Sequence, residues 1–253
     1  MSGDVVLTKL KNVILNNGVL IEAFTGVGMV ASIAANYMIS NLQLDQVAAM
    51  DSDDFPPVSM IYNGRPKLPC RVYCSLELNL AVFTSEVPLP IRKHRAVASE
   101  LIKWGTESGC TSFIAMDAIP REGEEAEEGA RPAGELPPVW AIGTSDASRK
   151  KMKESGLETL QVGMITGVSA VMLNMGRIQK LDVIGLYADA RTDIPDAAAA
   201  ASLVSILNKL LRPRPFSLSL KPLLDEAKDI QVQLEKVRRQ AEPAIKEPYN
   251  IYS

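Results

Sequence analysis

Short apolar runs of strand length alternate with longer stretches of helical period along most of this chain, and this alternation constrains the fold more than any other feature. Runs such as Val19–Phe24 and Val183–Tyr187 have strand length, whereas Val27–Leu42 and Val168–Ile178 have the length and composition of helices. Strands that alternate with helices form βαβ units on a largely parallel sheet. We therefore predict an α/β fold in which helices flank such a sheet.

The rest of the chain up to residue 211 continues this pattern. Apolar runs predict further strands at residues 47–50, 58–62, 71–76, 80–84, 112–116 and 139–142. Helical spacing predicts further helices at residues 92–108, from 146 onward, and at 196–211. Asn63-Gly64 is a strong hairpin signal and separates the expected strand at 58–62 from the one at 71–76.

Composition divides the chain into three parts. Residues 121–138 hold six glutamates among Gly, Ala and Pro, which is typical of a solvated loop. We predict an α/β domain over residues 1–220 that contains this loop, a helix over 221–242 and an extended tail over 243–253. Pro243 ends the helix, and Pro248 keeps the residues around it extended.

The C-terminal helix has a repeat of its own. Apolar residues recur at alternating four- and three-residue steps at Leu223, Ala227, Ile230, Leu234 and Val237. This heptad-like spacing keeps one seam of a helix facing a partner. Two interpretations stay open: the helix packs on its own domain, or it forms a contact between copies in a homo-oligomer.

Charge and cysteine content exclude several classes of function. A net charge of −3 and a pI near 5.4 leave no basic surplus for nucleic acid. No apolar stretch reaches the roughly 18 residues that a membrane span needs, and the first residues lack a signal sequence, so we expect a cytoplasmic protein without a membrane partner. Of Cys70, Cys74 and Cys110 only the first two lie close together, and no second pair has zinc-ligand spacing, so we expect all three to be reduced and buried.

A glycine-rich turn is the most enzyme-like feature of the sequence. Gly26 and Gly28 lie between an expected strand and helix, and Asp51 follows the next strand, as in much of a dinucleotide-binding fingerprint. Backbone donors at such a helix start can bind an anion, but the same glycines also suit a tight turn that packs a helix on a sheet. A nucleotide-binding protein or enzyme that uses these three residues is therefore the alternative function. Gly163 and Gly167 form a second turn with the same two interpretations.

No set of catalytic residues emerges from the sequence. His94 is the only histidine, and it stands in a basic cluster beside Arg92, Lys93 and Arg95. Neither a Ser/His/Asp arrangement nor a metal site with several histidines can be assembled around it. We expect no catalytic residue, no metal and no cofactor, and predict that the protein is not an enzyme.

The last three residues carry the clearest binding signal. Ile251, Tyr252 and Ser253 follow the two prolines, in a position where a buried structural role is not expected. The aliphatic group and the ring can fill a pocket while the terminal carboxylate pairs with a cation. We predict that these residues bind a partner protein.

The chain resembles the proteasome assembly chaperone family of the archaeal type from about Gly18 to Leu234. The resemblance is carried by short segments, namely Gly26-Val27-Gly28, Asp54-Phe55-Pro56-Pro57-Val58, Ser85-Glu86-Val87-Pro88, Gly163-Met164-Ile165-Thr166-Gly167 and Asp193-Ile194-Pro195-Asp196-Ala197-Ala198. The family often has a glycine-rich strand end where this chain has Met116-Asp117-Ala118, so loops at that edge are not carried over.

The resemblance implies a fold similar to the nucleoside phosphorylases, without their catalysis, and partners among the α subunits of the proteasome core particle. Members with a terminal hydrophobic-Tyr-X sequence insert it between neighbouring α subunits, where the carboxylate meets a lysine. The matching positions here are Ile251, Tyr252 and Ser253. A homo-oligomer would present several such tails and gain avidity. The resemblance thus implies an assembly chaperone, or an adaptor or activator that binds the core particle.

Overall fold

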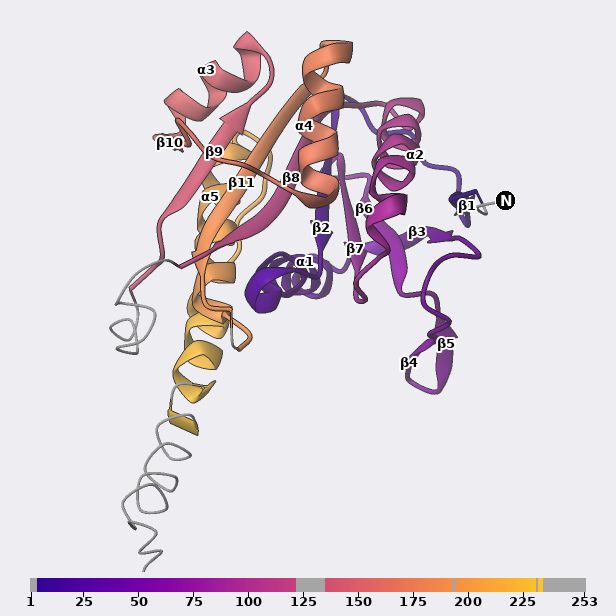
Figure 1. The fold of residues 1–253 in the computed structure, drawn as a ribbon, viewed down its shortest axis with the longest axis horizontal. Coiled ribbons are helices and arrows are strands. Elements are labelled where there is room, and N and C mark those ends of the chain that lie inside the picture. Colours follow the sequence, from indigo (N-terminus) through magenta and orange to yellow (C-terminus); the bar gives the residue numbers. More distant parts are fainter. Residues whose placement is uncertain (1–3, 122–134, 193, 231, 234–253) are drawn as a thin grey trace, which may run out of the picture.

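A nine-stranded mixed sheet forms the centre of the molecule (Figure 1). The structure is a computed structural model, and it describes residues 4–121, 135–192, 194–230 and 232–233. The strand order is β1-β3-β6-β7-β2-β8-β11-β9-β10. Its strands are β1 Val6–Lys9, β2 Gly18–Phe24, β3 Asp45–Asp51, β6 Cys70–Ser75, β7 Leu80–Ser85, β8 Cys110–Pro120, β9 Val139–Gly143, β10 Glu158–Thr159 and β11 Asp182–Ala190.

The four central strands, β7, β2, β8 and β11, are parallel, as predicted. The flanking pairs β1–β3, β3–β6, β6–β7 and β9–β11 are antiparallel. Only residues 76–79 separate β6 from β7, which is far too short for the crossover that parallel neighbours require. The sheet is therefore parallel at its centre, with antiparallel pairs on either side of the centre and the short edge strand β10 parallel to β9.

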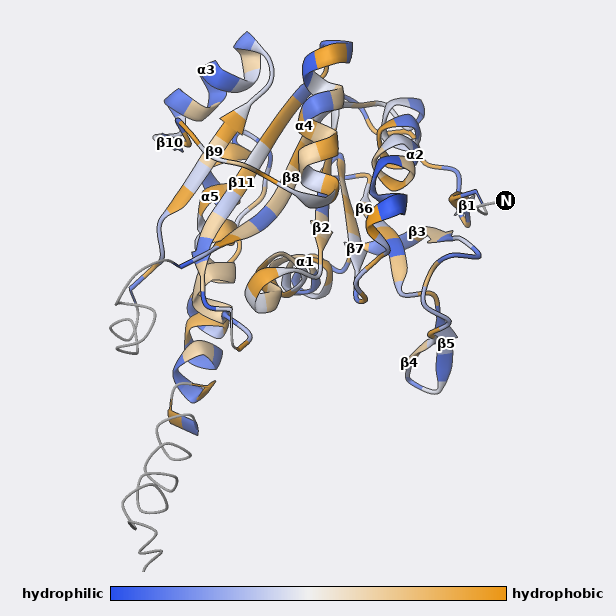
Figure 2. Ribbon diagram, viewed as in Figure 1, coloured by the Kyte–Doolittle hydropathy of each residue, from blue (hydrophilic) through white to orange (hydrophobic). Residues whose placement is uncertain are grey.

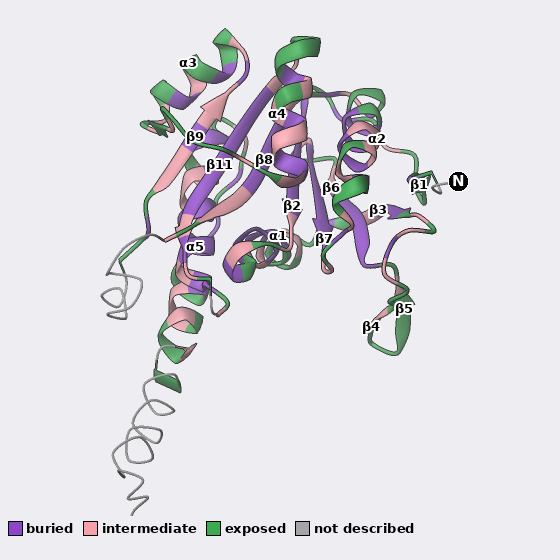
Figure 3. Cartoon of the chain, in the orientation of Figure 1, coloured by how far each residue is buried: buried purple, intermediate pink, exposed green. Residues whose placement is uncertain are grey.

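Helices cover both faces of the sheet. They are α1 Val30–Asn41, α2 His94–Glu107, α3 Asp146–Glu154, α4 Gly167–Gln179 and α5 Ala197–Leu210. Helices α1 and α5 pack together on one face, and α2 and α4 pack together on the other (Figure 1). Because both faces are covered, the middle residues of the central strands are buried and mostly apolar (Figures 2 and 3).

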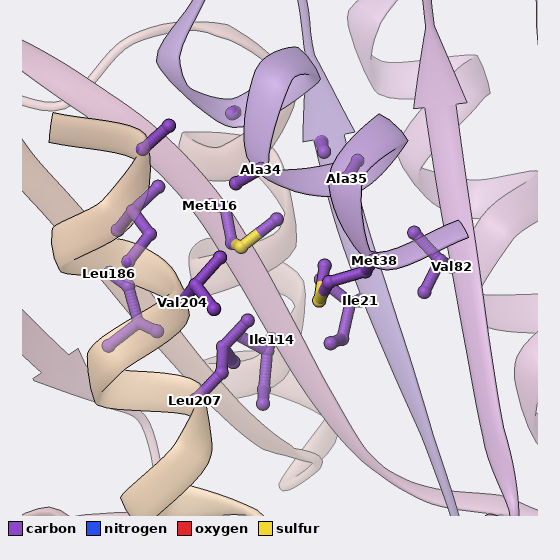
Figure 4. Close-up of a cluster of buried hydrophobic side chains, with 14 of the residues drawn as sticks. Ile21, Ala34, Ala35, Met38, Val82, Ile114, Met116, Leu186, Val204 and Leu207 are labelled. Carbon is purple, nitrogen blue, oxygen red and sulfur yellow. The ribbon is translucent and has the colours of Figure 1, made fainter. Parts of the chain in front are cut away.

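Alternation along each strand divides the apolar side chains into two cores. On β2, Ile21 belongs to the core under α1 and α5, and Leu20 to the core under α2 and α4. Figure 4 shows Ala34 of α1 near the core side chains of the central strands, with Leu207 of α5 beside them. Ala34 is fully buried, and its small side chain lets the helix approach the sheet closely.

The predicted Asn63-Gly64 turn is present, but its strands differ from the expected ones. Both residues have positive φ, 50° and 72°, as a two-residue hairpin turn requires. The turn joins β4 Met60–Tyr62 to β5 Arg65–Lys67 in a separate two-stranded sheet, and not to the strand at 71–76. The short strands β1, β5 and β10 were not predicted: β5 and β10 contain no apolar run, and the short apolar run at the start of β1 ends at the polar residues Thr8 and Lys9.

The C-terminal helix is described over residues 221–230 and 232–233 only. Leu223 is buried in the core under α1 and α5, while Ala227 and Ile230 are half-buried. Leu223 thus packs on its own domain, as one of the two interpretations expects. Predictions for Leu234, Val237, residues 122–134 of the acidic loop predicted at 121–138, and the tail at 243–253 lie outside the described residues. Within the described part, no helix is both long and apolar enough to span a membrane.

Candidate functional site

A cavity of about 850 Å³ opens at the carboxyl ends of the central parallel strands. Its walls come from the ends of β2, β8 and β11, from β9, and from the loop before α4 together with the first turn of that helix. Open α/β sheets bind ligands at this edge, because loops with free backbone groups meet there. The volume lies in the range of small-molecule pockets. This cavity is the candidate functional site.

Strand register places four cavity side chains in one row on the face covered by α2 and α4. Tyr187 of β11 lies between Asp117 of β8 and Trp140 of β9. Phe24 of β2 completes the row, because β2 pairs in parallel with β8 up to the preceding position. All four line the cavity, so its floor is a strip of two aromatic rings, a phenol and a carboxyl group.

Glu22 lies one row deeper on the same face and also lines the cavity. It is 1% exposed, and its Oε2 atom has no hydrogen-bond partner among the described residues. Burial and the nearby Asp117 carboxyl hold the pKa of Glu22 well above its ordinary value, because both disfavour the charged form. Glu22 is thus a buried acid that the rest of the described chain leaves unsatisfied.

Asp117 is half-buried beside Glu22 and is better supplied with donors. The hydroxyl group of Ser169, in the first turn of α4, donates to Asp117 Oδ2 at 3.2 Å, and the Ala118 amide donates to Oδ1 at 2.8 Å. Burial still raises the pKa of Asp117, although these hydrogen bonds oppose the shift. The negative charge of one carboxyl group therefore disfavours ionisation of the other, because both lie in one enclosed space.

Tyr187 owes its position to a missing side chain. A Cβ atom added at Gly185 would lie 2.7 Å from the Tyr187 hydroxyl oxygen, so the ring lies over this glycine. Tyr187 is 1% exposed, and its hydroxyl lies near that of Ser169 but makes no hydrogen bond of good geometry among the described residues. Burial raises the pKa of Tyr187 and keeps the phenol neutral. It offers an unused hydrogen-bonding group in the cavity wall.

The cavity wall also holds two groups that already have partners. Arg121 pairs with Asp189 at 3.3 Å, and a ring nitrogen of His94 lies 3.1 Å from the Leu89 carbonyl oxygen. His94 is half-buried and faces the cavity, whereas the sequence suggested only a basic surface cluster. Among the described residues that line the cavity, Glu22 Oε2 and the Tyr187 hydroxyl are left as the buried polar atoms without a hydrogen-bond partner.

The loop before α4 brings apolar side chains to the cavity. Val162 and Met164 line it and are 90% and 87% exposed. Gly167, with a φ of 81°, begins α4 at the cavity. The glycines of this loop therefore shape a wall, and the described residues include no cationic group within the loop from Leu160 to Ser169.

The structure separates the three residues of the predicted dinucleotide fingerprint. Gly26 lines the cavity, but Gly28 is buried, with a φ of 56° and a Cβ position 2.7 Å from the Arg191 carbonyl oxygen. Asp51 ends β3, and β6 and β7 lie between β3 and the β2 strand that precedes the glycines. Asp51 therefore does not face the glycine turn, and the arrangement needed to hold a dinucleotide is not formed. Gly28 instead permits close packing, and its carbonyl accepts the Asp196 amide at 2.8 Å.

The cysteines are buried and free, as predicted. Burial raises the pKa of Cys70 to about 11 and that of Cys110 to about 12, so these thiols are not activated as nucleophiles. In the described ranges no cluster of His, Cys, Asp and Glu side chains could hold a metal ion.

Sequence reasoning did not single out Glu22, Asp117, Tyr187 or Trp140. The one available signal was Glu22, a charged residue inside the apolar run Val19–Phe24, where burial of an unpaired carboxylate is costly. The other three residues come from distant strands, and only the strand order brings them together.

Comparison with known proteins identifies the family. The model of the PAC2 family matches residues 20–238, which is most of the chain. The chain belongs to the PAC2 family. This PAC2 protein is also 25% identical over 224 residues to an uncharacterized protein of Methanocaldococcus jannaschii, a match that covers 88% of the chain and 87% of the relative.

Solved structures extend the comparison. The PAC2 protein is similar to Pyrococcus furiosus PbaA, described as an archaeal homolog of proteasome-assembly chaperone, with a TM-score of 0.81 and 30% identity over 96% of this chain and 95% of PbaA. It also shares its fold with P. furiosus PbaB, described as an archaeal proteasome activator, with a TM-score of 0.76 and 21% identity over 93% and 99% of the two chains. The resemblance to the proteasome assembly chaperone family is confirmed.

Proposed function

We propose that this PAC2 protein is a proteasome assembly chaperone, or an adaptor that binds the core particle, and that it docks Ile251, Tyr252 and Ser253 into pockets of the α ring. The observation that carries the proposal is the similarity to PbaA along almost the whole of both chains at 30% identity. In this proposal the α/β body is a scaffold, and the protein acts by binding rather than by catalysis.

The chemistry of the last three residues fits such a pocket. Ile251 and Tyr252 supply an aliphatic group and an aromatic ring, which bury apolar area while the phenol hydroxyl reaches a polar partner. The carboxylate of Ser253 would pair with a cationic side chain of the α ring, because an anion in a partly closed pocket requires a counter-charge. One tail of this size gives weak binding.

A homo-oligomer would compensate for the weakness of one tail. Ala227 and Ile230 are half-buried, and Val232 is 48% exposed, so this end of the C-terminal helix keeps apolar area available. Leu223 already packs in its own core, so the contact between copies would begin after it. Several tails on one particle raise the effective concentration of the second and later ones, with a gain of about 100-fold or more.

Pull-down with a proteasome core particle tests the tail. The chain without its last three residues is compared with the full chain and with a Ser253→Ala variant, which keeps the ring, the aliphatic group and a terminal carboxylate. We expect the truncated chain to lose at least about tenfold in binding, and the Ser253→Ala variant to bind like the full chain. Undiminished binding of the truncated chain would remove the tail from the mechanism.

Light scattering tests the oligomer. Ile230→Asp places a charge on the expected seam, and Lys228→Asp places the same side chain on an exposed position of the same helix. We expect Ile230→Asp to lower the solution mass and to weaken core-particle binding, and Lys228→Asp to change neither. Equal masses for the Ile230→Asp variant and the unchanged protein would contradict the proposed contact.

A further inference from the structure

We propose that the cavity at the carboxyl ends of β2, β8 and β11 binds a small organic cation, a protonated amine or amidinium attached to an aromatic or aliphatic body. The charged group of this ligand lies at Asp117 and Glu22, and its apolar body lies along Trp140. This binding site goes beyond the proteasome function and requires none of the tail residues.

The first argument is the charge of the cavity floor. Glu22 and Asp117 lie close enough to raise the pKa of Glu22, and within the described residues neither makes an ion pair. The nearby Arg121 is paired with Asp189. A carboxylate taken out of water is stable only with a counter-charge or strong donors. A cation at the floor would supply that charge, whereas a phosphate or carboxylate ligand would be repelled.

The second argument is the set of unused hydrogen-bonding atoms. Glu22 Oε2 and the Tyr187 hydroxyl are both buried and have no hydrogen-bond partner among the described residues. An ammonium group carries three donors and an amidinium carries four, so either can satisfy two carboxyl groups and the phenol oxygen at once. Buried polar atoms are nearly always paired, and two orphans in one cavity indicate a site made for donors.

The third argument is the shape and lining of the cavity. Trp140 and Phe24 flank the Asp117–Tyr187 pair in the same row, and Leu160, Met164 and Val168 add aliphatic walls. An aromatic face beside an acid stabilises a cation through its ring electrons. A volume of about 850 Å³ accommodates a ligand much larger than a metal ion. The cavity therefore combines an acidic floor with apolar sides.

A purely structural role does not account for this floor. Structural acids in a buried position are expected to have cationic partners, as Glu86, directly after β7, does with Arg71 of β6. Apolar residues of the same volume would be at least as favourable for stability as an unpaired carboxyl pair. Perturbed acids that gather in a cavity are typical of ligand sites.

Matched probes test the proposal on the full chain. Tryptamine and benzamidine are the cations, tryptophol and benzamide are neutral molecules of the same shape, and indole-3-propionate and benzoate are the anions. Titration is followed by the side-chain N–H signals of the two tryptophans in an NMR spectrum. Trp140 lines the cavity, whereas Trp104 is 3% exposed in the core under α2, so it serves as an internal control.

We expect at least one cation to shift the Trp140 signal in a saturable way at concentrations up to about 1 mM, with the Trp104 signal unchanged. The matched neutral probe should bind at least about tenfold more weakly than the cation, because it lacks the charge contact with the two acids. The anion should not bind. Binding of neither cation, or equal binding of cation, neutral probe and anion, would overturn the proposal.

Asp117→Asn then locates the charge. We expect the cation to bind this variant no better than its neutral counterpart does, whereas Asp146→Asn, at a fully exposed carboxylate of α3, should bind the cation like the unchanged protein. A cation preference that survives in Asp117→Asn and in Glu22→Gln would overturn the assignment. The comparison of probes on the unchanged protein stands even where a variant does not fold.

Discussion

The buried ion pair between Arg71 and Glu86 allows a quantitative prediction. Their side chains are 2% and 9% exposed, and Glu86 also accepts the Tyr62 hydroxyl at 2.6 Å, which links the β4–β5 hairpin to the main sheet. Glu86→Gln keeps the shape and removes the charge. Breaking a buried pair by removing one partner costs about 3 to 5 kcal/mol, because the remaining charge stays buried without compensation.

The structure places the expected loss near the lower end of that range. Arg71 still donates to the Leu68 carbonyl at 3.0 Å, and its guanidinium lies 5.1 Å and 5.7 Å from the ring centroids of Tyr62 and Tyr73. These contacts partly stabilise the unpaired cation. We therefore expect Glu86→Gln to lower the free energy of unfolding by about 3 kcal/mol, and the melting temperature by about 6 to 12 °C in a chain of this size.

Urea unfolding measures the effect, with Glu107→Gln as the matched control. Glu107 pairs with Lys9 at 3.0 Å, but the side chains are 47% and 48% exposed, so solvent screens the pair and its loss should cost far less stability than that of the buried pair. A loss below about 1 kcal/mol for Glu86→Gln would refute the reasoning that burial makes this pair costly to break.

The double variant Arg71→Met with Glu86→Leu completes the test. Arg71 Nε and Glu86 Oε2 have no hydrogen-bond partner among the described residues, so the pair is incompletely satisfied. Replacing both charges with apolar groups of similar size should therefore leave the free energy of unfolding within about 1 kcal/mol of that of the unchanged protein. A double variant as unstable as Glu86→Gln would show that the loss is one of packing and not of charge.

Three further predictions follow from the described residues. Because the pKa of Glu22 is raised in the folded state, the unchanged protein should lose stability as the pH rises from about 4.3 through that raised pKa, whereas the Glu22→Gln variant should not lose stability in this way. In urea unfolding, the stability of Glu22→Gln relative to the unchanged protein should therefore grow from pH 4 to pH 8. A stability difference that does not vary with pH would contradict this. By calorimetry, Gly109→Ala should lower the free energy of unfolding more than Gly156→Ala does. Both glycines have positive φ, which costs an alanine about 1 to 2 kcal/mol, but only at Gly109 would the new Cβ lie 2.1 Å from the Leu15 carbonyl oxygen. Equal losses of stability in the two variants would exclude the clash. Burial, which raises the pKa of Cys110 to about 12, should make its labelling by iodoacetamide at pH 8 depend on unfolding, and rapid labelling of the folded chain would refute this.

Most of the elements could be predicted from the sequence, because local composition decides them. The run Val19–Phe24 is apolar throughout and forms a strand covered on both faces, and the helical spacing at 168–178 matches α4. The Asn63-Gly64 turn follows from the positive φ that these two residues tolerate. The sequence also carried the resemblance that the family comparison confirms.

The sequence alone did not determine which strands are neighbours. The glycine turn and Asp51 matched a fingerprint in order and spacing, but β6 and β7 lie between their strands. Likewise, β10 was missed because two polar residues, Glu158 and Thr159, pair at an edge and leave no periodic signal. Pairing between distant segments depends on contacts that no local window contains.

The sequence by itself determined the α/β class, because side-chain periodicity and turn residues act over a few positions, and its short motifs carried the resemblance to the family. Only the tertiary structure decided the cavity. It sets Glu22, Asp117 and Tyr187 from three separate strands on one face of the sheet, and the absence of a side chain at Gly185 gives the Tyr187 ring its place. The physical reason is that burial raises the pKa of an acid only when the fold has removed its water, and which acids share one enclosed space depends on the strand order.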